Sequence, residues 1–268
     1  MRIGNKDFPE GERTYVMGIL NVTPDSFSDG GKYNNMDAAM QQAEAMIQAG
    51  ADILDVGGES TRPGHVQIGD EEEIRRVVPV IQALKERFDV PVSIDTYKSA
   101  VAEAALEAGA DLLNDIWGFQ YDERCAELAV RYDVAVCLMH NRDNTEYQNF
   151  VADVQNDLKK SLKIAEKYGV KKERIMLDPG VGFAKTLEQN LMIMNHLEDI
   201  VAMGYPVLLG TSRKSMIGLT LDLPVDQREE GTMATSVIGA MKGCQYVRVH
   251  DVEKNVRALK MTDAILHA

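Results

Sequence analysis

Arg248 and His250 stand two positions apart near the end of the chain, in the segment VRVHDV. Alternate residues of an extended strand point to the same side, so both side chains face one way and the neighbouring valines face the other. Alone, the histidine could be a core residue and the arginine a surface ion pair. Together with Lys214 and Arg62, they form a cationic set that suits a phosphate or pyrophosphate ligand.

The overall charge makes this cationic set informative. A formal net charge of −13 and a pI near 4.9 would repel a polyphosphate backbone or an anionic membrane, so we expect no nucleic-acid and no membrane partner. No run approaches the ~18 apolar residues that a membrane span needs. Any anionic substrate must therefore be held by a local basic cluster.

The cysteines bear on the cellular compartment. Cys125, Cys137 and Cys244 are far apart and show no CxxC spacing, and the first residues lack the apolar core of a signal peptide. We therefore expect a cytoplasmic protein with reduced thiols.

Acidic and amide side chains follow three separate apolar runs. Asp95, Asn114 and Asp178 each stand where such a run ends. Carboxylate and amide groups suit a flat heterocycle with several N–H donors. The alternative, that they only cap the next helix, is strongest for Asp178, which precedes a Pro-Gly turn signature.

Two loops, residues 21–31 and 57–64, are rich in glycine, serine, threonine and aspartate. They have turn chemistry and hydroxyl donors but little core-forming content, so they could be simple connectors. Phe27 favours a function for the first loop, because an exposed aromatic ring there must cover something. The segment GTSRKS at 210–215 lacks P-loop spacing, and the sequence contains no serine nucleophile elbow, HExxH motif or cysteine-rich metal site.

Eight short apolar runs are the candidate strands that position these side chains. They are rich in valine, isoleucine and leucine without strict alternation, as in parallel strands buried on both faces. The runs are 15–20, 53–56, 92–94, 112–113, 134–138, 175–177, 206–209 and 246–249.

Stretches with helical periodicity lie between these runs. The apolar positions from 74 to 88 share one face, on which Pro79 should produce a kink, and similar stripes cover 40–47, 151–162 and 191–201. Five glycines follow such stretches, where a left-handed cap favours glycine. They are Gly50, Gly109, Gly169, Gly204 and Gly243.

The alternation of strands and helices predicts a single-domain (β/α)8 TIM barrel over residues 1–268. The length is near the ~250 residues of such barrels, whose active sites lie at the strand C-terminal ends. GADILD at 50–55 is echoed by GADLLN at 109–114, an interval that fits two βα units. An open doubly wound sheet is the alternative, disfavoured by the lack of GxGxxG after the first strand.

The motifs, in order along nearly the whole chain, resemble those of dihydropteroate synthases. The two most specific are MGILNVTPDSFSDGG at 17–31 and DVGGESTRPG at 55–64. The others are SIDT at 93–96, LND at 113–115, LDPGVGF at 177–183, GTSRKS at 210–215 and VRVHDV at 247–252. Residues 65–69 and 142–147 depart from the family pattern, so no contacts are assigned to them.

The resemblance implies an enzyme that joins (7,8-dihydropterin-6-yl)methyl diphosphate to 4-aminobenzoate, releasing pyrophosphate and forming 7,8-dihydropteroate for folate biosynthesis. It also implies a homodimer. The residues that it implies for the pterin ring are Asp95, Asn114, Asp178 and Lys214. Those for the diphosphate or the pterin edge are Thr61, Arg248 and His250, with Asn21 binding Mg2+ together with the diphosphate. Those for the 4-aminobenzoate pocket are Phe27, Arg62, Pro63, Phe183 and Ser215.

Substitution at an activated methylene needs little help from a protein nucleophile. We expect Asp95, Lys214, Arg248 and His250 to be the catalytic residues, with Arg248, His250 and Mg2+ stabilising the departing pyrophosphate. A dissociative route with Asp95 supporting the cation is our hypothesis. The rivals are a pterin-binding methyltransferase, which would not need the first loop, the TRP turn or a diphosphate site, and a catalytically silent pterin-binding scaffold.

Overall fold

The computed structural model describes residues 1–23, 32–59 and 67–268, and only the backbone of 32–35. Eight parallel strands form one sheet in the spatial order β8-β7-β6-β5-β4-β3-β10-β9. A bridge between Leu177 and Val207 joins the two ends of this order and closes the sheet. The strands are β3 Tyr15–Asn21, β4 Ile53–Gly57, β5 Val92–Asp95, β6 Leu112–Asp115, β7 Ala135–Met139, β8 Ile175–Asp178, β9 Leu208–Leu209 and β10 Tyr246–Val249. The predicted (β/α)8 barrel is confirmed, and the open-sheet alternative is wrong.

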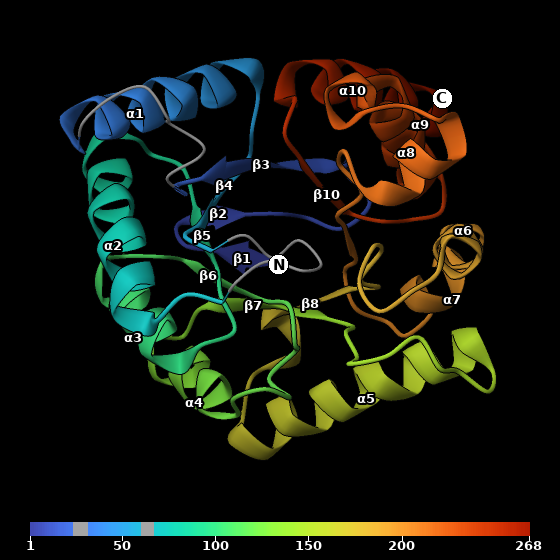
Figure 1. The fold of residues 1–268 in the computed structure, drawn as a ribbon, viewed down its shortest axis with the longest axis horizontal. Coiled ribbons are helices and arrows are strands. Elements are labelled where there is room, and N and C mark those ends of the chain that lie inside the picture. The colour runs from blue at the N-terminus through green and yellow to red at the C-terminus, as the bar shows by residue number, and fades with distance from the viewer. Residues whose placement is uncertain (24–31, 60–66) are drawn as a thin grey trace.

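Helices surround these strands as an outer ring (Figure 1). They are α1 Lys32–Ala49, α2 Asp70–Arg87, α3 Ser99–Glu107, α4 Arg124–Arg131, α5 Phe150–Tyr168, α6 Leu187–Asn195, α7 Leu197–Val201, α8 Ser215–Leu221, α9 Glu229–Met241 and α10 Val252–Leu266. Short 3-10 helices at Lys172–Arg174 and Val225–Gln227 precede β8 and α9. Within the described ranges, none of these helices has both the length and the apolar character of a membrane span.

The five predicted glycine caps are confirmed. Their φ angles lie between 78° and 104°, a left-handed conformation that side chains with a Cβ rarely adopt. One helix prediction was wrong: the apolar stripe of 191–201 belongs to two helices, α6 and α7. His196 separates them because its backbone, at φ −114° and ψ 27°, leaves the helical conformation. Helix α2 continues through Pro79 as one element.

A small hairpin closes the N-terminal end of the barrel. Strands β1 (Arg2–Ile3) and β2 (Lys6–Asp7) pair antiparallel. Ile3 and Phe8 join the apolar cluster inside the barrel, where the Phe8 and Tyr15 rings meet edge to face with centroids 5.0 Å apart. Side chains therefore fill the barrel interior at this end, which leaves the other end, where the strands terminate, for the site.

The inner face of the barrel changes from apolar to polar within two residues. Ile53, Leu112, Met176 and Tyr246 are fully buried in the inner cluster, one on each of the alternate strands β4, β6, β8 and β10. Alternate strands of such a barrel contribute to the same layer of four side chains. Two positions further on, the next inward side chains on these strands are Asp55, Asn114, Asp178 and Arg248. The layer that these four side chains form is thus entirely polar.

Candidate active site

Arg248 lies at the centre of the polar layer. Its Nε donates to Asp55 Oδ2 at 2.6 Å and its Nη2 to Asp95 Oδ2 at 2.7 Å. Asn114 Nδ2 also donates to Asp55 Oδ2, at 3.3 Å. The structure therefore brings together three of the predicted site residues, Asp95, Asn114 and Arg248, around a carboxylate that the sequence reasoning did not select.

Asp55 could have been found from the internal repeat, in which it is the counterpart of Asn114, 59 residues later. The repeat puts both residues on alternate strands and so in one layer. Asp55 has a fully buried side chain, and a buried carboxylate needs a partner of opposite charge. Arg248 supplies that charge.

Two carboxylate oxygens of the aspartates around Arg248 are left without a partner. Among the described residues, Asp55 Oδ1 and Asp95 Oδ1 are buried side-chain oxygens without a hydrogen-bond donor. Each such oxygen costs about 1–3 kcal/mol, which a ligand N–H group would offset. Burial also raises the pKa of Asp95 to about 7, although the positive charge of Arg248 opposes this shift. A ring with several N–H donors would complement these oxygens.

Asp178 and Lys214 lie beside the same layer. At Gly210 an added Cβ would come 3.5 Å from Asp178 Oδ2, 3.9 Å from Lys214 Nζ and 4.0 Å from Arg248 Cβ, so all three side chains converge there. Burial lowers the pKa of Lys214 to about 8, although Asp178 opposes the shift. The ammonium group lies 4.5 Å from the centroid of the Phe183 ring, a cation–π distance.

Apolar side chains form a second wall. Tyr97, Ile116 and Met139 make a small buried cluster, against which Trp117 and Phe183 pack. Ile116 follows β6 directly, and Met139 is the last residue of β7. The sequence reasoning missed Ile116 and Met139 because it looked only for polar groups at strand ends. Apolar walls beside carboxylates and amides suit a flat, polar-edged ring.

His250 directly follows β10. His250 Nδ1 is 2.9 Å from Ser212 Oγ, and the His250 backbone N–H donates to the same oxygen at 3.1 Å. Lys214 is the residue before α8, and Ser215 is the first residue of that helix and is exposed. Four other predicted site residues, Phe27, Thr61, Arg62 and Pro63, lie outside the residues that the structure describes.

Asn21, the predicted Mg2+ ligand, is the last residue of β3. Its Oδ1 would be 3.2 Å from a Cβ on Gly57, and Asp95 Cβ would be 3.8 Å away, so glycine leaves space between them. In the described part of the chain, no group of three or more His, Cys, Asp or Glu side chains forms a metal cage. Mg2+ commonly uses one or two protein oxygens together with substrate phosphates and water. A single amide oxygen at this position would fit such an ion.

Comparison with known proteins agrees with this geometry. A family model described as "Pterin binding enzyme" matches residues 17–250. The chain is 64% identical to a dihydropteroate synthase of Clostridium beijerinckii over 267 residues, which are 99% of each chain. It is 53% identical to that of Bacillus subtilis, covering 96% of this chain and 90% of the relative. The chain belongs to the dihydropteroate synthase family.

Solved structures of the family have the same fold. The dihydropteroate synthase of Clostridium difficile, solved in the presence of pteroic acid, matches with a TM-score of 0.95 and 52% identity, covering 98% of this chain and 100% of that one. The Xanthomonas albilineans enzyme with 4-aminobenzoic acid matches with a TM-score of 0.92 and 40% identity, covering 96% and 95%. These likenesses confirm the sequence-based family assignment and do not favour the methyltransferase alternative.

Proposed function

We infer that the chain transfers the (7,8-dihydropterin-6-yl)methyl group from its diphosphate to 4-aminobenzoate, forming 7,8-dihydropteroate and pyrophosphate. The observation that carries this inference is the convergence of Asp95, Asn114, Asp178, Lys214 and Arg248 at the open end of the barrel. Carboxylates and an amide there suit the pterin edge, and the cations beside them suit the departing phosphates.

We propose that the pterin ring occupies the polar layer. The unpartnered Oδ1 atoms of Asp55 and Asp95 accept ring N–H groups, and Asp178 Oδ2 adds another acceptor next to Gly210. Lys214, held beside Asp178, donates to a ring acceptor. The cluster of Tyr97, Ile116 and Met139 packs against the ring face and excludes water. Ring recognition therefore uses acceptors on one edge and apolar contact on the face.

The leaving group lies on the cationic side of the same site. Arg248 and His250, with Thr61 from the loop after β4, bind the diphosphate oxygens. Asn21 Oδ1 is the residue that would hold Mg2+, which when bound supplies positive charge to the diphosphate. As the methylene C–O bond breaks, its electron pair leaves with pyrophosphate, and Arg248 stabilises that developing charge.

The new C–N bond forms from the side of Phe183. Phe183, Ser215, Phe27, Arg62 and Pro63 shape the 4-aminobenzoate pocket in this proposal. The amine lone pair attacks the methylene carbon, and the nitrogen then loses one proton. In a dissociative route the dihydropterin ring delocalises the cation, and the carboxylate of Asp95 stabilises it. Exclusion of water prevents hydrolysis of this intermediate.

The decisive experiment is to incubate the purified chain with pterin diphosphate, Mg2+ and 4-aminobenzoate, and to measure dihydropteroate and pyrophosphate together. We expect both products in equal amounts. Omission of 4-aminobenzoate should abolish dihydropteroate formation. A folded chain that releases no dihydropteroate under these conditions would instead be a silent pterin-binding scaffold, which binding of the pterin alone would reveal.

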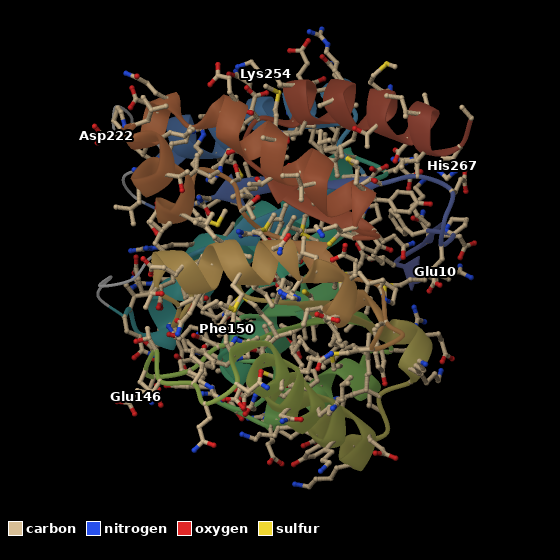
Figure 2. All side chains as sticks on the ribbon, turned by 90° about the vertical axis from the view of Figure 1, so that its right-hand side faces the viewer. Glu10, Glu146, Phe150, Asp222, Lys254 and His267 are labelled. Carbon is tan, nitrogen blue, oxygen red and sulfur yellow. The ribbon has the colours of Figure 1, made fainter. Side chains whose placement is uncertain are left out.

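We also propose a cytoplasmic homodimer. Large apolar side chains are exposed on α8, α9 and α10, the helices on the face turned to the viewer in Figure 2. They include Leu219, Met241, Met261 and Ile265, each more than 60% exposed. A second copy of the chain would cover them, and the three buried, unpaired cysteines suit a reducing compartment. Light scattering should give twice the mass of one chain, and Met241→Asp should lower it.

A further inference from the structure

The loop between β8 and α6 has an unusual backbone. Gly180, Gly182 and Ala184 all have positive φ angles, of 68°, 86° and 45°. A left-handed conformation costs a residue such as alanine about 1–2 kcal/mol, so other contacts must hold this loop in place. The loop carries Phe183, which belongs to the 4-aminobenzoate pocket proposed above.

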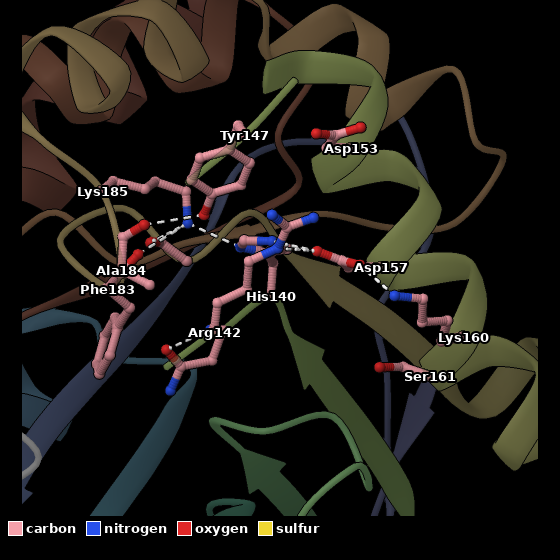
Figure 3. A network of polar contacts seen from close by, with 12 residues as sticks. His140, Arg142, Tyr147, Asp153, Asp157, Lys160, Ser161, Phe183, Ala184 and Lys185 are labelled. Atoms are coloured by element: carbon pink, nitrogen blue, oxygen red, sulfur yellow. Dashed lines mark hydrogen bonds and ion pairs between the residues drawn. The ribbon is translucent and has the colours of Figure 1, made fainter. Parts of the chain in front are cut away.

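Lys185 supplies most of these contacts. Its Nζ donates to the carbonyl oxygens of Gly180 at 2.9 Å and Phe183 at 3.0 Å, and it lies 2.8 Å from His140 Nδ1 (Figure 3). An ammonium group has three protons, and these three acceptors use all of them. Lys185 therefore ties two points of the loop to the end of β7.

The His140 ring is fixed in turn by a hydrogen bond on its other side. With Nδ1 accepting from Lys185, the remaining proton is on Nε2, which donates to Asp157 Oδ2 at 3.2 Å. Burial lowers the pKa of His140 to about 4, although Asp157 opposes the shift, so the ring is neutral near pH 7. Asp157, on α5, also accepts from Arg142 Nε at 2.5 Å and Lys160 Nζ at 2.7 Å.

Other side chains complete the fixation of this loop. Tyr147 OH donates to the Ala184 carbonyl at 2.9 Å, and Gly182 N donates to Asn190 Oδ1 at 2.6 Å. On the substrate side, Lys214 Nζ donates to the Val181 carbonyl at 2.5 Å. Two lysines thus donate to neighbouring carbonyls of one loop. Lys214 does so from the side of the site, and Lys185 from the side of His140.

We propose that Lys185 is a positioning residue for the transfer reaction, which holds the β8–α6 loop so that Phe183 faces 4-aminobenzoate in the correct geometry. The proposal rests on the proposed function. Lys185 contacts neither substrate in this proposal; it acts through the loop carbonyls. The neutral His140, fixed by Asp157, is its anchor on the barrel.

The groups around Lys185 shift the pKa of its amino group. Burial lowers the pKa of Lys185 to about 7, with Asp178 and Asp157 opposing the shift and Lys214 and Arg142 adding to it. None of its three hydrogen-bond partners is a carboxylate. The amino group is thus held mainly by the carbonyls it positions, and its removal should release them.

The test compares Lys185→Met with Lys160→Met. Both remove an amino group from the same network, but Lys160 is exposed, and its Nζ donates to Asp157 Oδ1 on the same helix rather than to the loop. For Lys185→Met we expect the KM for 4-aminobenzoate to rise about tenfold, as for the loss of hydrogen bonds to one charged group. The Kd for a pterin analogue should stay within about threefold, and Lys160→Met should match the parent in both values.

A double-mutant cycle with Phe183→Ala separates positioning from a general structural effect. If Lys185 acts through Phe183, Lys185→Met should change the KM for 4-aminobenzoate less than twofold in the Phe183→Ala background. Full additivity, or an equal effect of Lys160→Met, would overturn the proposal. The parent chain's turnover is measured alongside, so its absence would count against the proposed function rather than against this inference.

Discussion

Single residues of the polar layer combine binding and electrostatic roles. Arg248 forms ion pairs with both Asp55 and Asp95, yet each of these carboxylates keeps one oxygen without a partner. The arginine is consequently fixed before any substrate arrives, and the free oxygens are aimed at a ligand. Preorganisation of this kind lowers the cost of ordering the site during the reaction.

Asp95 should make pterin binding depend on pH. Its pKa in the free protein is raised to about 7, so protonation below that value removes the acceptor that the ring needs. Binding of a pterin analogue, measured by calorimetry, should be about eightfold weaker at pH 6 than at pH 7.5. This range stays below the pKa of Lys214. In Asp95→Asn the binding should be weak and nearly independent of pH; an unchanged slope would assign the titration to another group.

His250 should affect turnover more than binding. Its ring is hydrogen-bonded to Ser212, and in the proposed function it contacts the diphosphate rather than the ring. His250→Ala should lower kcat by about a hundredfold, comparable to the loss of one donor to a developing anion. The Kd for a pterin analogue without phosphates should change less than about threefold. Turnover at the parent rate would show that His250 does not stabilise the leaving group.

At the scale of elements, the strands and helix ends could be predicted because their signals are local. Each buried strand is an apolar run, and each of the five glycine caps follows a helix. The β1–β2 hairpin could not be predicted, since strands of two residues have no periodicity. The break at His196 was hidden because the apolar stripe continues across it. The positions of Asp95, Asn114 and Arg248 followed from the strand ends, which parallel strands place together.

The β8–α6 loop shows what the sequence does not contain. Lys185 and Tyr147 bind carbonyl groups of the loop, and the positive φ angles of the loop set the directions of these groups. Their roles also depend on the packing of β7 beside β8. Residues 142–147 were left without contacts because they depart from the family pattern. No spacing in the sequence encodes these carbonyl directions, whereas the Pro-Gly pair in LDPGVGF at least marked a turn.

Gly180→Ala and Gly169→Ala test this loop as an element. Both glycines have positive φ angles, 68° and 86°, so each substitution should cost about 1–2 kcal/mol of strain. At Gly169 a Cβ meets nothing within 4 Å, but at Gly180 it would lie 2.0 Å from the His140 carbonyl oxygen. We expect Gly169→Ala to lower only the free energy of unfolding, and Gly180→Ala also to lower kcat/KM at least tenfold. Equal activities would mean that the loop geometry is not needed.

On the scale of the whole molecule, stability and chemistry occupy opposite ends of one barrel. The apolar inner cluster lies between the β1–β2 hairpin and the polar layer, and it supports that layer. Charged groups in that layer are costly in isolation and depend on a rigid support, because an arginine that can move no longer faces both carboxylates. The two ends should therefore respond differently to substitution.

Phe8→Ala tests this separation. The Phe8 ring is 4% exposed and packs on Tyr15 and Tyr246, so its loss should lower the free energy of unfolding in urea by about 3–5 kcal/mol. The kcat of the protein that remains folded should stay within about twofold, because no atom of Phe8 belongs to the polar layer. Leu191→Ala, at a side chain that is 45% exposed, is the control and should change neither value appreciably. If Phe8→Ala reduced kcat as strongly as His250→Ala, the closed end would be coupled to the reaction, and the barrel could not be treated as a passive support.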